Sequence, residues 1–174
     1  MLIKTIFLDR DGVINKEVNY LHKIDDCEFI PGIFDACIYF QNIGFKIIII
    51  TNQSGIARGY FDESDYQALT DWIIKQFSAK NIDILDVFHC PHGPDSSCNC
   101  RKPKPGMLLE AKNKYNINMT NSWLIGDKEV DILAANNAGI INTILVRSGH
   151  KINEYSSNAR YVLDSIHAST KIII

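Results

Sequence analysis

Short apolar segments alternate with amphipathic helical patterns along the chain, and this alternation limits the possible folds more than any other feature of the sequence. The apolar segments have the length and the two-sided hydrophobicity of central strands in a parallel sheet, and they are residues 5–8, 45–50, 85–89, 122–125, 143–146 and 160–162. Strands that alternate with helices imply right-handed crossovers and helices on both faces of one sheet. The sequence therefore predicts an α/β fold with a three-layer, doubly wound, Rossmann-like parallel sheet.

The helical patterns are bounded by typical start and stop residues. The first pattern ends at Gly44, and Asp62 is suited to cap the start of the second. Pro105 suits the first turn of the third pattern, because proline is tolerated there. The fourth pattern, residues 131–138, stops at Gly139. We therefore expect four helices in the connections between the strands.

Length and composition narrow the classes of protein. A chain of 174 residues with 46% hydrophobic content has the size of one domain, and we expect residues 1–174 to form it. The 18 basic and 20 acidic residues give a formal net charge of −2, so no overall positive field attracts nucleic acid or an anionic membrane. Apolar runs such as residues 47–50 are far shorter than the roughly 18 residues that span a bilayer. We expect a cytoplasmic monomer with neither nucleic-acid nor membrane partners.

The first predicted strand ends in two carboxylates, in the sequence IFLDRDGVIN at residues 6–15. In an open parallel sheet the ligand crevice lies beyond the carboxyl ends of the strands, where Asp9 falls. Residues two apart in an extended chain point the same way about 7 Å apart, so Asp9 and Asp11 can address one ligand. Gly12 lets the backbone turn without a side chain in the crevice. Because an isolated Asp-x-Asp also occurs as an acidic turn, the interpretation depends on the other strand ends.

Polar groups also follow three later predicted strands. The second strand runs into TNQSG at residues 51–55, whose hydroxyl, amide and backbone N–H groups suit an anion. The third strand leads to Arg101 and Lys102, and the fourth ends in Gly126 and Asp127. Each segment alone fits an ordinary polar turn or solvated loop. Together they predict a site with three carboxylates, neutral donors and a lysine.

Three of the five cysteines gather in one short segment with a histidine: Cys90, His92, Cys98 and Cys100. Four such ligands match a closed, tetrahedral Cys₃His zinc site, which is structural because no position stays open for substrate. Reduced surface thiols are the alternative, but they give no reason for all four ligands to gather just before Arg101. We therefore predict a zinc-binding loop at residues 90–100 that fixes the cations after it.

The four strand-end motifs together resemble the haloacid dehalogenase superfamily of phosphohydrolases. They are DRDGV at residues 9–13, TNQ at 51–53, RKPKPG at 101–106 and GDKEVD at 126–131. Longer stretches resemble a zinc-containing family in its histidinol-phosphatase-like branch, whose substrate is D-glycero-D-manno-heptose 1,7-bisphosphate; they are NYLHKIDDCEFIPG, TNQSGIARGYF, CPHG, CNCRKPKPGM and LIGDKEVDILAANNAGI. The resemblance covers nearly the whole chain. It implies the haloacid dehalogenase fold, here without a separate cap domain.

Catalytic roles follow from this resemblance together with the chemistry of phosphate esters. Asp9 is the expected nucleophile, which forms an aspartyl-phosphate, and Asp11 is the expected general acid and base. Mg²⁺ is the expected cofactor beside Zn²⁺, with Asp9, Asp127 and the backbone carbonyl of Asp11 as ligands and Asp131 as their brace. Thr51 and Lys102 are expected to complete the catalytic set by stabilising the transferred phosphoryl group.

The resemblance also implies how the substrate is held. Asn52 is expected to bind the transferred phosphoryl group, whereas Arg58, Arg101 and Lys128 are candidates for the second phosphate or the sugar hydroxyls, or else ordinary surface charges. The leading hypothesis is magnesium-dependent removal of the 7-phosphate from the small sugar bisphosphate in nucleotide-activated heptose biosynthesis, which serves the assembly of lipopolysaccharide or of another heptose-bearing glycan. A phosphatase for histidinol phosphate or another small metabolite is the alternative enzyme, and an inactive, zinc-stapled binding module is the alternative of another class.

Overall fold

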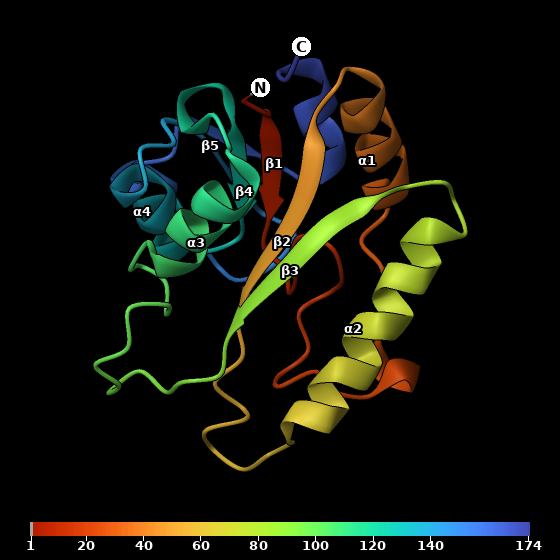
Figure 1. Ribbon diagram of the computed structural model, residues 1–174, viewed down its shortest axis with the longest axis vertical. Helices are drawn as coiled ribbons and strands as arrows, with labels where there is room; N and C mark the ends of the chain where they lie inside the picture. Colours follow the sequence, from red (N-terminus) through yellow and green to blue (C-terminus); the bar gives the residue numbers. More distant parts are fainter. Residues whose placement is uncertain (1) are drawn as a thin grey trace.

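The computed structural model describes residues 2–174, and its six strands form one parallel sheet in the order β3-β2-β1-β4-β5-β6 (Figure 1). The strands are β1 Thr5–Leu8, β2 Lys46–Asn52, β3 Ile84–Cys90, β4 Trp123–Gly126, β5 Asn142–Val146 and β6 Tyr161–Leu163. The helices are α1 Ile33–Asn42, α2 Glu63–Ser78, α3 Gly106–Tyr115 and α4 Glu129–Asn137. Short 3₁₀ turns are η1 Ile24–Asp26, η2 Met119–Asn121, η3 Glu154–Ser156 and η4 Ile166–Lys171.

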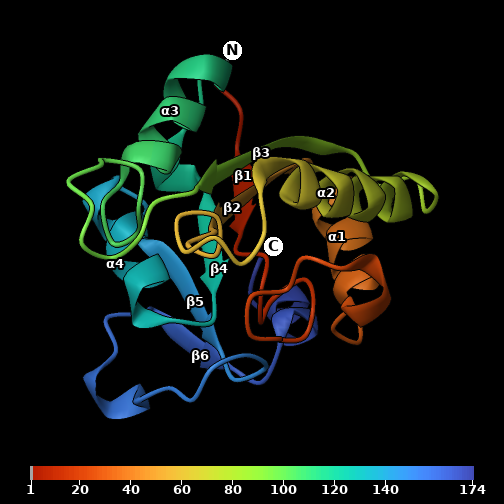
Figure 2. The ribbon, with the colours of Figure 1, turned by 90° about the horizontal axis from the view of Figure 1, so that it is seen from below.

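Helices cover both faces of the sheet, as the alternating sequence predicts. Successive strand residues point to opposite faces, so Ile6 and Leu8 of β1 pack on the same side as α1 and α2, whereas Phe7 packs on the side of α3 and α4. Figure 2 shows the two helix pairs on opposite sides of the strands. The sequence-based prediction of a three-layer, doubly wound fold is therefore confirmed.

Element boundaries differ from the prediction by one or two residues in most places. Strand β2 continues through Thr51 and Asn52, which the sequence had suggested as a loop. Helix α4 starts at Glu129 rather than at residue 131, and Pro105 lies just before α3 rather than in its first turn. The cap at Asp62 forms as predicted, because its carboxylate accepts the backbone N–H of Asp65 at 2.9 Å.

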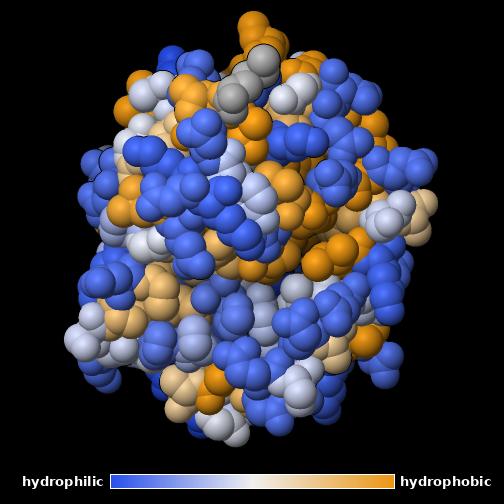
Figure 3. All heavy atoms as spheres, viewed as in Figure 1, coloured by the Kyte–Doolittle hydropathy of each residue, from blue (hydrophilic) through white to orange (hydrophobic). Residues whose placement is uncertain are grey.

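The expectation that every strand is buried on both faces is wrong for the two edge strands, β3 and β6, and all three residues of β6 are half-buried. Most side chains of β3, including Ile84 and Val87, are likewise half-buried, because an edge strand has a partner strand on one side only. Figure 3 shows apolar surface near the β3 edge of the molecule, among polar side chains. Within residues 2–174, none of the helices is both long and apolar enough to cross a bilayer.

The chain reverses its direction of winding between β1 and β4. These neighbours pair in parallel, with Leu8 opposite Ile125, while the helices after β1 and after β4 cover opposite faces. Ligands of doubly wound sheets bind beyond the carboxyl ends of the strands at such a reversal. Asp9 follows β1 and Asp127 follows β4, so the fold brings these two side chains to that crevice.

Candidate active site

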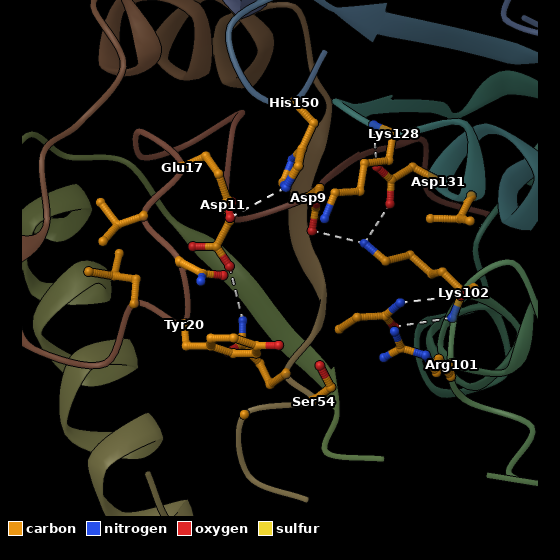
Figure 4. Close-up of a pocket in the computed structure, with 17 residues that line it drawn as sticks. Asp9, Asp11, Glu17, Tyr20, Ser54, Arg101, Lys102, Lys128, Asp131 and His150 are labelled. Carbon is orange, nitrogen blue, oxygen red and sulfur yellow. Dashed lines mark hydrogen bonds and ion pairs between the residues drawn. The ribbon is translucent and has the colours of Figure 1, made fainter. Parts of the chain in front are cut away.

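Three buried carboxylates and one buried ammonium meet at the ends of β1 and β4. Ligand oxygens of Asp9, Asp127 and Asp131 all lie within 4.8 Å of one another, and the three residues are 7%, 0% and 1% exposed. The Lys102 ammonium lies 2.8 Å from Oδ1 of Asp9 and 2.7 Å from Oδ1 of Asp131. Figure 4 shows the lysine reaching between these two carboxylates. Asp131 thus holds Lys102 as well as closing the first turn of α4, where it accepts the Lys128 N–H at 3.0 Å.

The cluster has an excess of negative charge when all its carboxylates are ionised. Burial raises the pKa of Asp9 well above its usual range; Lys102 opposes this, and the neighbouring carboxylates Asp131 and Asp127 add to it. Oδ1 of Asp127 is buried and has no hydrogen-bond partner among the described residues. Buried, unpaired carboxylate oxygens are suitable ligands for a hard divalent cation such as Mg²⁺. The donor set therefore fits the magnesium site that the sequence suggested.

Backbone packs closely around Asp127. Gly12 has a φ of +86°, and a Cβ atom there would lie 2.3 Å from Oδ2 of Asp127. A Cβ atom on Gly149 would lie 2.1 Å from the same oxygen. That oxygen accepts the backbone N–H of His150 at 2.9 Å and lies 2.6 Å from Nδ1 of its ring. Only glycine fits at these two positions, so the turn after β1 and the loop after β5 fix the Asp127 carboxylate.

A cavity of about 350 Å³ opens above the cluster. Its wall consists of residues 9, 11, 17–21, 52–55, 101, 102, 128, 130, 131 and 150. The predicted substrate-binding residues Asn52, Arg101 and Lys128 belong to this wall. Arg58 does not belong to it. Cζ of Arg58 lies 6.0 Å from the centroid of the Tyr20 ring. Residues 90–100 likewise lie outside the wall.

The two predicted donors at the end of β2 make other contacts. Asn52 pairs with the backbone of Lys102: its Oδ1 accepts the N–H at 3.1 Å and its Nδ2 donates to the carbonyl at 3.3 Å. The Thr51 hydroxyl is buried and accepts a hydrogen bond from Nε2 of Gln53 at 2.8 Å. Asn52 therefore fixes the loop that presents the lysine.

One rim of the cavity is an aromatic contact between two loops. Tyr20 has a φ of 57°, an unusual value for a residue with a side chain. Its ring lies 4.5 Å from the ring of Tyr60, between centroids. The ring of His22 stacks on Phe61 at 5.3 Å. These two ring contacts fasten the loop after β1 to the loop after β2.

Sequence reasoning missed several polar residues of this site, and for Gln53 it suggested a different role, that of holding an anion. Arg10, Asn15 and Gln53 surround the Asp11 carboxylate. Glu17 and His150 line the cavity opposite Lys102, with 3.4 Å between Oε1 of Glu17 and Nε2 of His150. Arg10 had a signal in the sequence, since a charged residue between two functional carboxylates invites a role. Glu17 and His150 are brought together by loops far apart in the chain, so no local pattern points to them.

The four predicted zinc ligands come together at the end of β3. Sγ of Cys90 lies 3.8 Å from Sγ of Cys98 and 2.8 Å from Sγ of Cys100, and Nδ1 of His92 lies 3.5 Å from Cys90 Sγ and 3.3 Å from Cys100 Sγ. Ligands of a tetrahedral zinc ion are about 3.4–3.8 Å apart, given its usual bond lengths. Two of these separations fall in this range, whereas the His92–Cys100 and Cys90–Cys100 pairs are closer.

The thiols of this cluster differ in their ease of ionisation. Burial raises the pKa of the Cys90 thiol to about 12. Burial also opposes ionisation of Cys98, but hydrogen bonds from the Arg101 backbone, Ser96 and the neighbouring thiols lower its pKa to about 6. Cys98 therefore ionises more readily than Cys90. Because zinc binds thiolates, its uptake here would release protons.

The fold and the crevice define a haloacid dehalogenase-type hydrolase. The family described as "HAD-hyrolase-like" matches residues 99–169. A D,D-heptose 1,7-bisphosphate phosphatase from B. bronchiseptica, solved in complex with magnesium and phosphate, has a similar structure, with a TM-score of 0.86 and 31% identity over 98% of each chain.

Curated relatives narrow the family further. The D-glycero-α-D-manno-heptose-1,7-bisphosphate 7-phosphatase of Photorhabdus laumondii is 52% identical over 90% of each chain, and that of Campylobacter jejuni is 48% identical over 89% of each. The corresponding β-anomer phosphatase of Escherichia coli K12 is 42% identical over 94% of this chain and 90% of its own. The chain belongs to the D-glycero-D-manno-heptose-1,7-bisphosphate 7-phosphatase family and is a phosphoric monoester hydrolase.

Proposed function

We propose that the protein removes the 7-phosphate of D-glycero-α-D-manno-heptose 1,7-bisphosphate by a magnesium-dependent reaction through an aspartyl-phosphate. The buried cluster of Asp9, Asp127, Asp131 and Lys102 carries the proposal, because it joins a candidate nucleophile, a divalent-cation site and an ammonium in one crevice. The α anomer is favoured over the β anomer because identity is higher to the relatives named for the α anomer.

Asp9 is the nucleophile in this proposal. One of its oxygens is held by Lys102 at 2.8 Å, which leaves the other oxygen to attack phosphorus in line with the leaving alkoxide. Asp11 lies in the wall of the same cavity and donates a proton to the departing C7 oxygen. In the second step Asp11 takes a proton from the water that hydrolyses the aspartyl-phosphate. The bond between phosphorus and Asp9 then breaks, so the Asp9 carboxylate is regenerated and inorganic phosphate leaves.

The proposed ligands of Mg²⁺ are the side chains of Asp9 and Asp127 and the backbone carbonyl of Asp11. A magnesium ion held by these residues would supply positive charge that offsets the negative charge of the phosphoryl group and of the nucleophile. Support comes from the excess negative charge of the cluster and from the buried, unpaired Oδ1 of Asp127. Asp131 keeps Lys102 in place from the other side.

The cations and neutral donors around the cavity are assigned to the phosphates and the sugar. Thr51, Asn52 and Lys102 belong to the phosphoryl-binding side, where Asn52 acts by holding the backbone of Lys102. Arg101 and Lys128 line the same cavity and are the proposed contacts of the sugar hydroxyls and the 1-phosphate. Arg58 is proposed only as an outer contact, because it lies beyond the wall.

The zinc loop is proposed as a structural part of a single domain comprising residues 1–174. Zinc held by Cys90, His92, Cys98 and Cys100 would fix residues 90–100 next to Arg101 and Lys102. Support comes from the mutual approach of the four ligand atoms to within 4.8 Å. Free thiols suit a reducing compartment, so we assign the enzyme to the cytoplasm. We further propose that it acts as a monomer.

Steady-state kinetics with purified enzyme test the proposal. The panel contains both heptose 1,7-bisphosphate anomers, fructose 1,6-bisphosphate and histidinol phosphate, each with and without Mg²⁺. Phosphorus NMR of the products identifies which phosphate leaves. We expect the highest kcat/KM for the α anomer, loss of the 7-phosphate only, and no turnover in Asp9→Asn.

Other outcomes contradict specific parts of the proposal. A preference for the β anomer changes the assigned substrate but not the reaction. A preference for histidinol phosphate makes the protein a phosphatase of another small metabolite. If the metal-loaded enzyme hydrolyses no phosphate monoester, the inactive binding module becomes the better explanation.

A further inference from the structure

Three side chains hold the carboxylate of Asp11. Arg10 donates from Nε to Oδ1 at 3.2 Å and from Nη2 to Oδ2 at 3.0 Å. Asn15 donates from Nδ2 to Oδ1 at 3.0 Å, and Gln53 donates from Nε2 to Oδ2 at 3.2 Å. Both carboxylate oxygens are therefore fixed from more than one direction. We call Arg10, Asn15 and Gln53 the Asp11 cradle.

The cradle is itself rigid, because its members are buried and each is held by a second contact. Nη2 of Arg10 donates to the carbonyl of Leu21 at 3.1 Å, and Nδ2 of Asn15 donates to the carbonyl of Lys16 at 2.9 Å. The three cradle residues are 3%, 0% and 4% exposed, in chain order. Donors on a fixed frame hold a partner more precisely than donors on mobile side chains.

Within the cradle, Gln53 links Asp11 to a second strand. Its side chain donates both to Asp11 and to the Thr51 hydroxyl, at 2.8 Å, and its backbone N–H donates to the carbonyl of Cys90 at 2.7 Å. The amide is thus engaged inside the protein rather than directed at an anion, which was the role suggested for the TNQSG segment. It connects Asp11, on the turn after β1, to the end of β2.

We propose that Gln53 is a positioning residue that orients the Asp11 carboxyl for proton transfer to the leaving oxygen. The inference deepens the proposed function and rests on its assignment of Asp11. In the first step the bond between phosphorus and the leaving oxygen breaks, the bond between phosphorus and Asp9 forms, and the Asp11 proton goes to the leaving oxygen. Proton transfer depends steeply on geometry, so a freely rotating Asp11 makes a poorer acid.

Leaving-group dependence separates this role from a structural one. A sugar alkoxide needs a proton to depart, whereas p-nitrophenolate leaves without one. The parameter kcat/KM includes only the steps up to departure of the leaving group, so water activation in the second step does not affect it. Damage to the acid must therefore lower kcat/KM more for a sugar phosphate than for p-nitrophenyl phosphate. A fault in phosphate binding lowers both alike.

The test compares Gln53→Met with the wild-type holoenzyme on heptose 1,7-bisphosphate and p-nitrophenyl phosphate. Methionine has a similar size but no N–H donor. We expect kcat/KM for the sugar phosphate to fall about 10–100-fold, within the range of general acid catalysis, and to fall at least about tenfold more than for the aryl phosphate. Gln67→Met is the matched control, because Gln67 is exposed on α2, where its side chain donates to Oδ1 of Asp71 at 2.8 Å.

Equal losses on the two substrates would overturn the inference, as would no loss on either. Metal content and thermal unfolding of each variant show whether the fold survives. If Gln53→Met does not fold, Gln53→Glu is the second variant, because it keeps the shape and removes the donor to Asp11. If wild-type enzyme prefers another alkyl phosphate to heptose bisphosphate, the proposed function fails, but the same comparison with that substrate still decides the role of Gln53.

Discussion

The ammonium of Lys102 lies 2.8 Å from Oδ1 of Asp9, although ninety-three positions separate the two residues in the chain. The contact joins the loop before α3 to the end of β1. The contact also fixes the position of Oδ1 of Asp9, because the lysine that donates to it is itself held by a second hydrogen bond, to the carbonyl of Ile50 at 3.1 Å. The nucleophile is therefore oriented by a residue that also serves the phosphoryl side of the site.

Lys102→Met should remove both effects. We expect kcat to fall by at least about 10²–10³, the usual cost of losing one preorganised donor to a developing charge. Stability measured by urea unfolding without Mg²⁺ should fall by about 3–5 kcal/mol, because buried carboxylates lose their cation. Lys112→Met on the exposed face of α3 is the control and should change neither quantity. Near wild-type kcat in Lys102→Met would remove the lysine from the catalytic set.

Asp11→Asn should allow detection of the covalent intermediate. With p-nitrophenyl phosphate the first step needs no acid, so Asp9 is still phosphorylated, whereas the second step lacks the base that activates water. Rapid-quench mass spectrometry should therefore show a phosphorylated peptide that contains residue 9. The double variant with Asp9→Asn should show none. Absence of phosphoenzyme from Asp11→Asn at every quench time would count against the two-step scheme.

Much of the fold could be predicted from the sequence, because it depends on local patterns. The alternation of apolar strands with helical segments is enough to predict helices on both faces of a parallel sheet. The strand ends then bring Asp9 and Asp127 together, since parallel strands present their carboxyl ends at one edge. The four ligands of the predicted zinc loop lie within eleven residues, so their approach needs little tertiary information.

The side-chain contacts inside the crevice were harder to predict from the sequence. The position of Arg10 between two aspartates in the sequence does not show that its guanidinium turns toward Asp11. Nothing in the sequence near residue 53 indicates that Gln53 reaches the same carboxylate. Arg58 belongs to a stretch that resembles the family, yet it lies outside the cavity wall. These contacts depend on loop conformations that no periodic pattern encodes.

Stabilisation by Mg²⁺ should increase with pH. Burial, with opposition from Lys102 and reinforcement from Asp131 and Asp127, raises the pKa of Asp9 above its usual value of 3.8. The folded protein therefore holds this proton more tightly than the unfolded chain, and the contribution of Asp9 to stability falls as pH rises from about 4 through the raised pKa. A bound cation offsets the negative charge of ionised Asp9. Mg²⁺ should therefore stabilise the folded protein more at high pH than at low pH.

Thermal unfolding with and without Mg²⁺ at about pH 5 and about pH 8 measures this effect. We expect the gain in Tm from Mg²⁺ to be clearly larger at the higher pH. In Asp9→Asn, which cannot ionise at this position, the gain should be small and should change little with pH. An equal gain in wild-type protein at both pH values would exclude Asp9 as a ligand whose proton competes with the metal.

Loss of one zinc ligand should affect the active site while leaving the core sheet folded. Protein purified without chelator should carry about one zinc per chain, and Cys98→Ser should lower that content. Because the loop leads directly to Arg101 and Lys102, we expect KM to rise and kcat to fall together. Mg²⁺ should still be required, since a closed zinc site has no open position for substrate.

Cys27→Ser, outside the cluster, is the matched control. Zinc-free wild-type protein, or a Cys98→Ser variant with unchanged kinetics, would refute the zinc site and leave these cysteines as ordinary thiols.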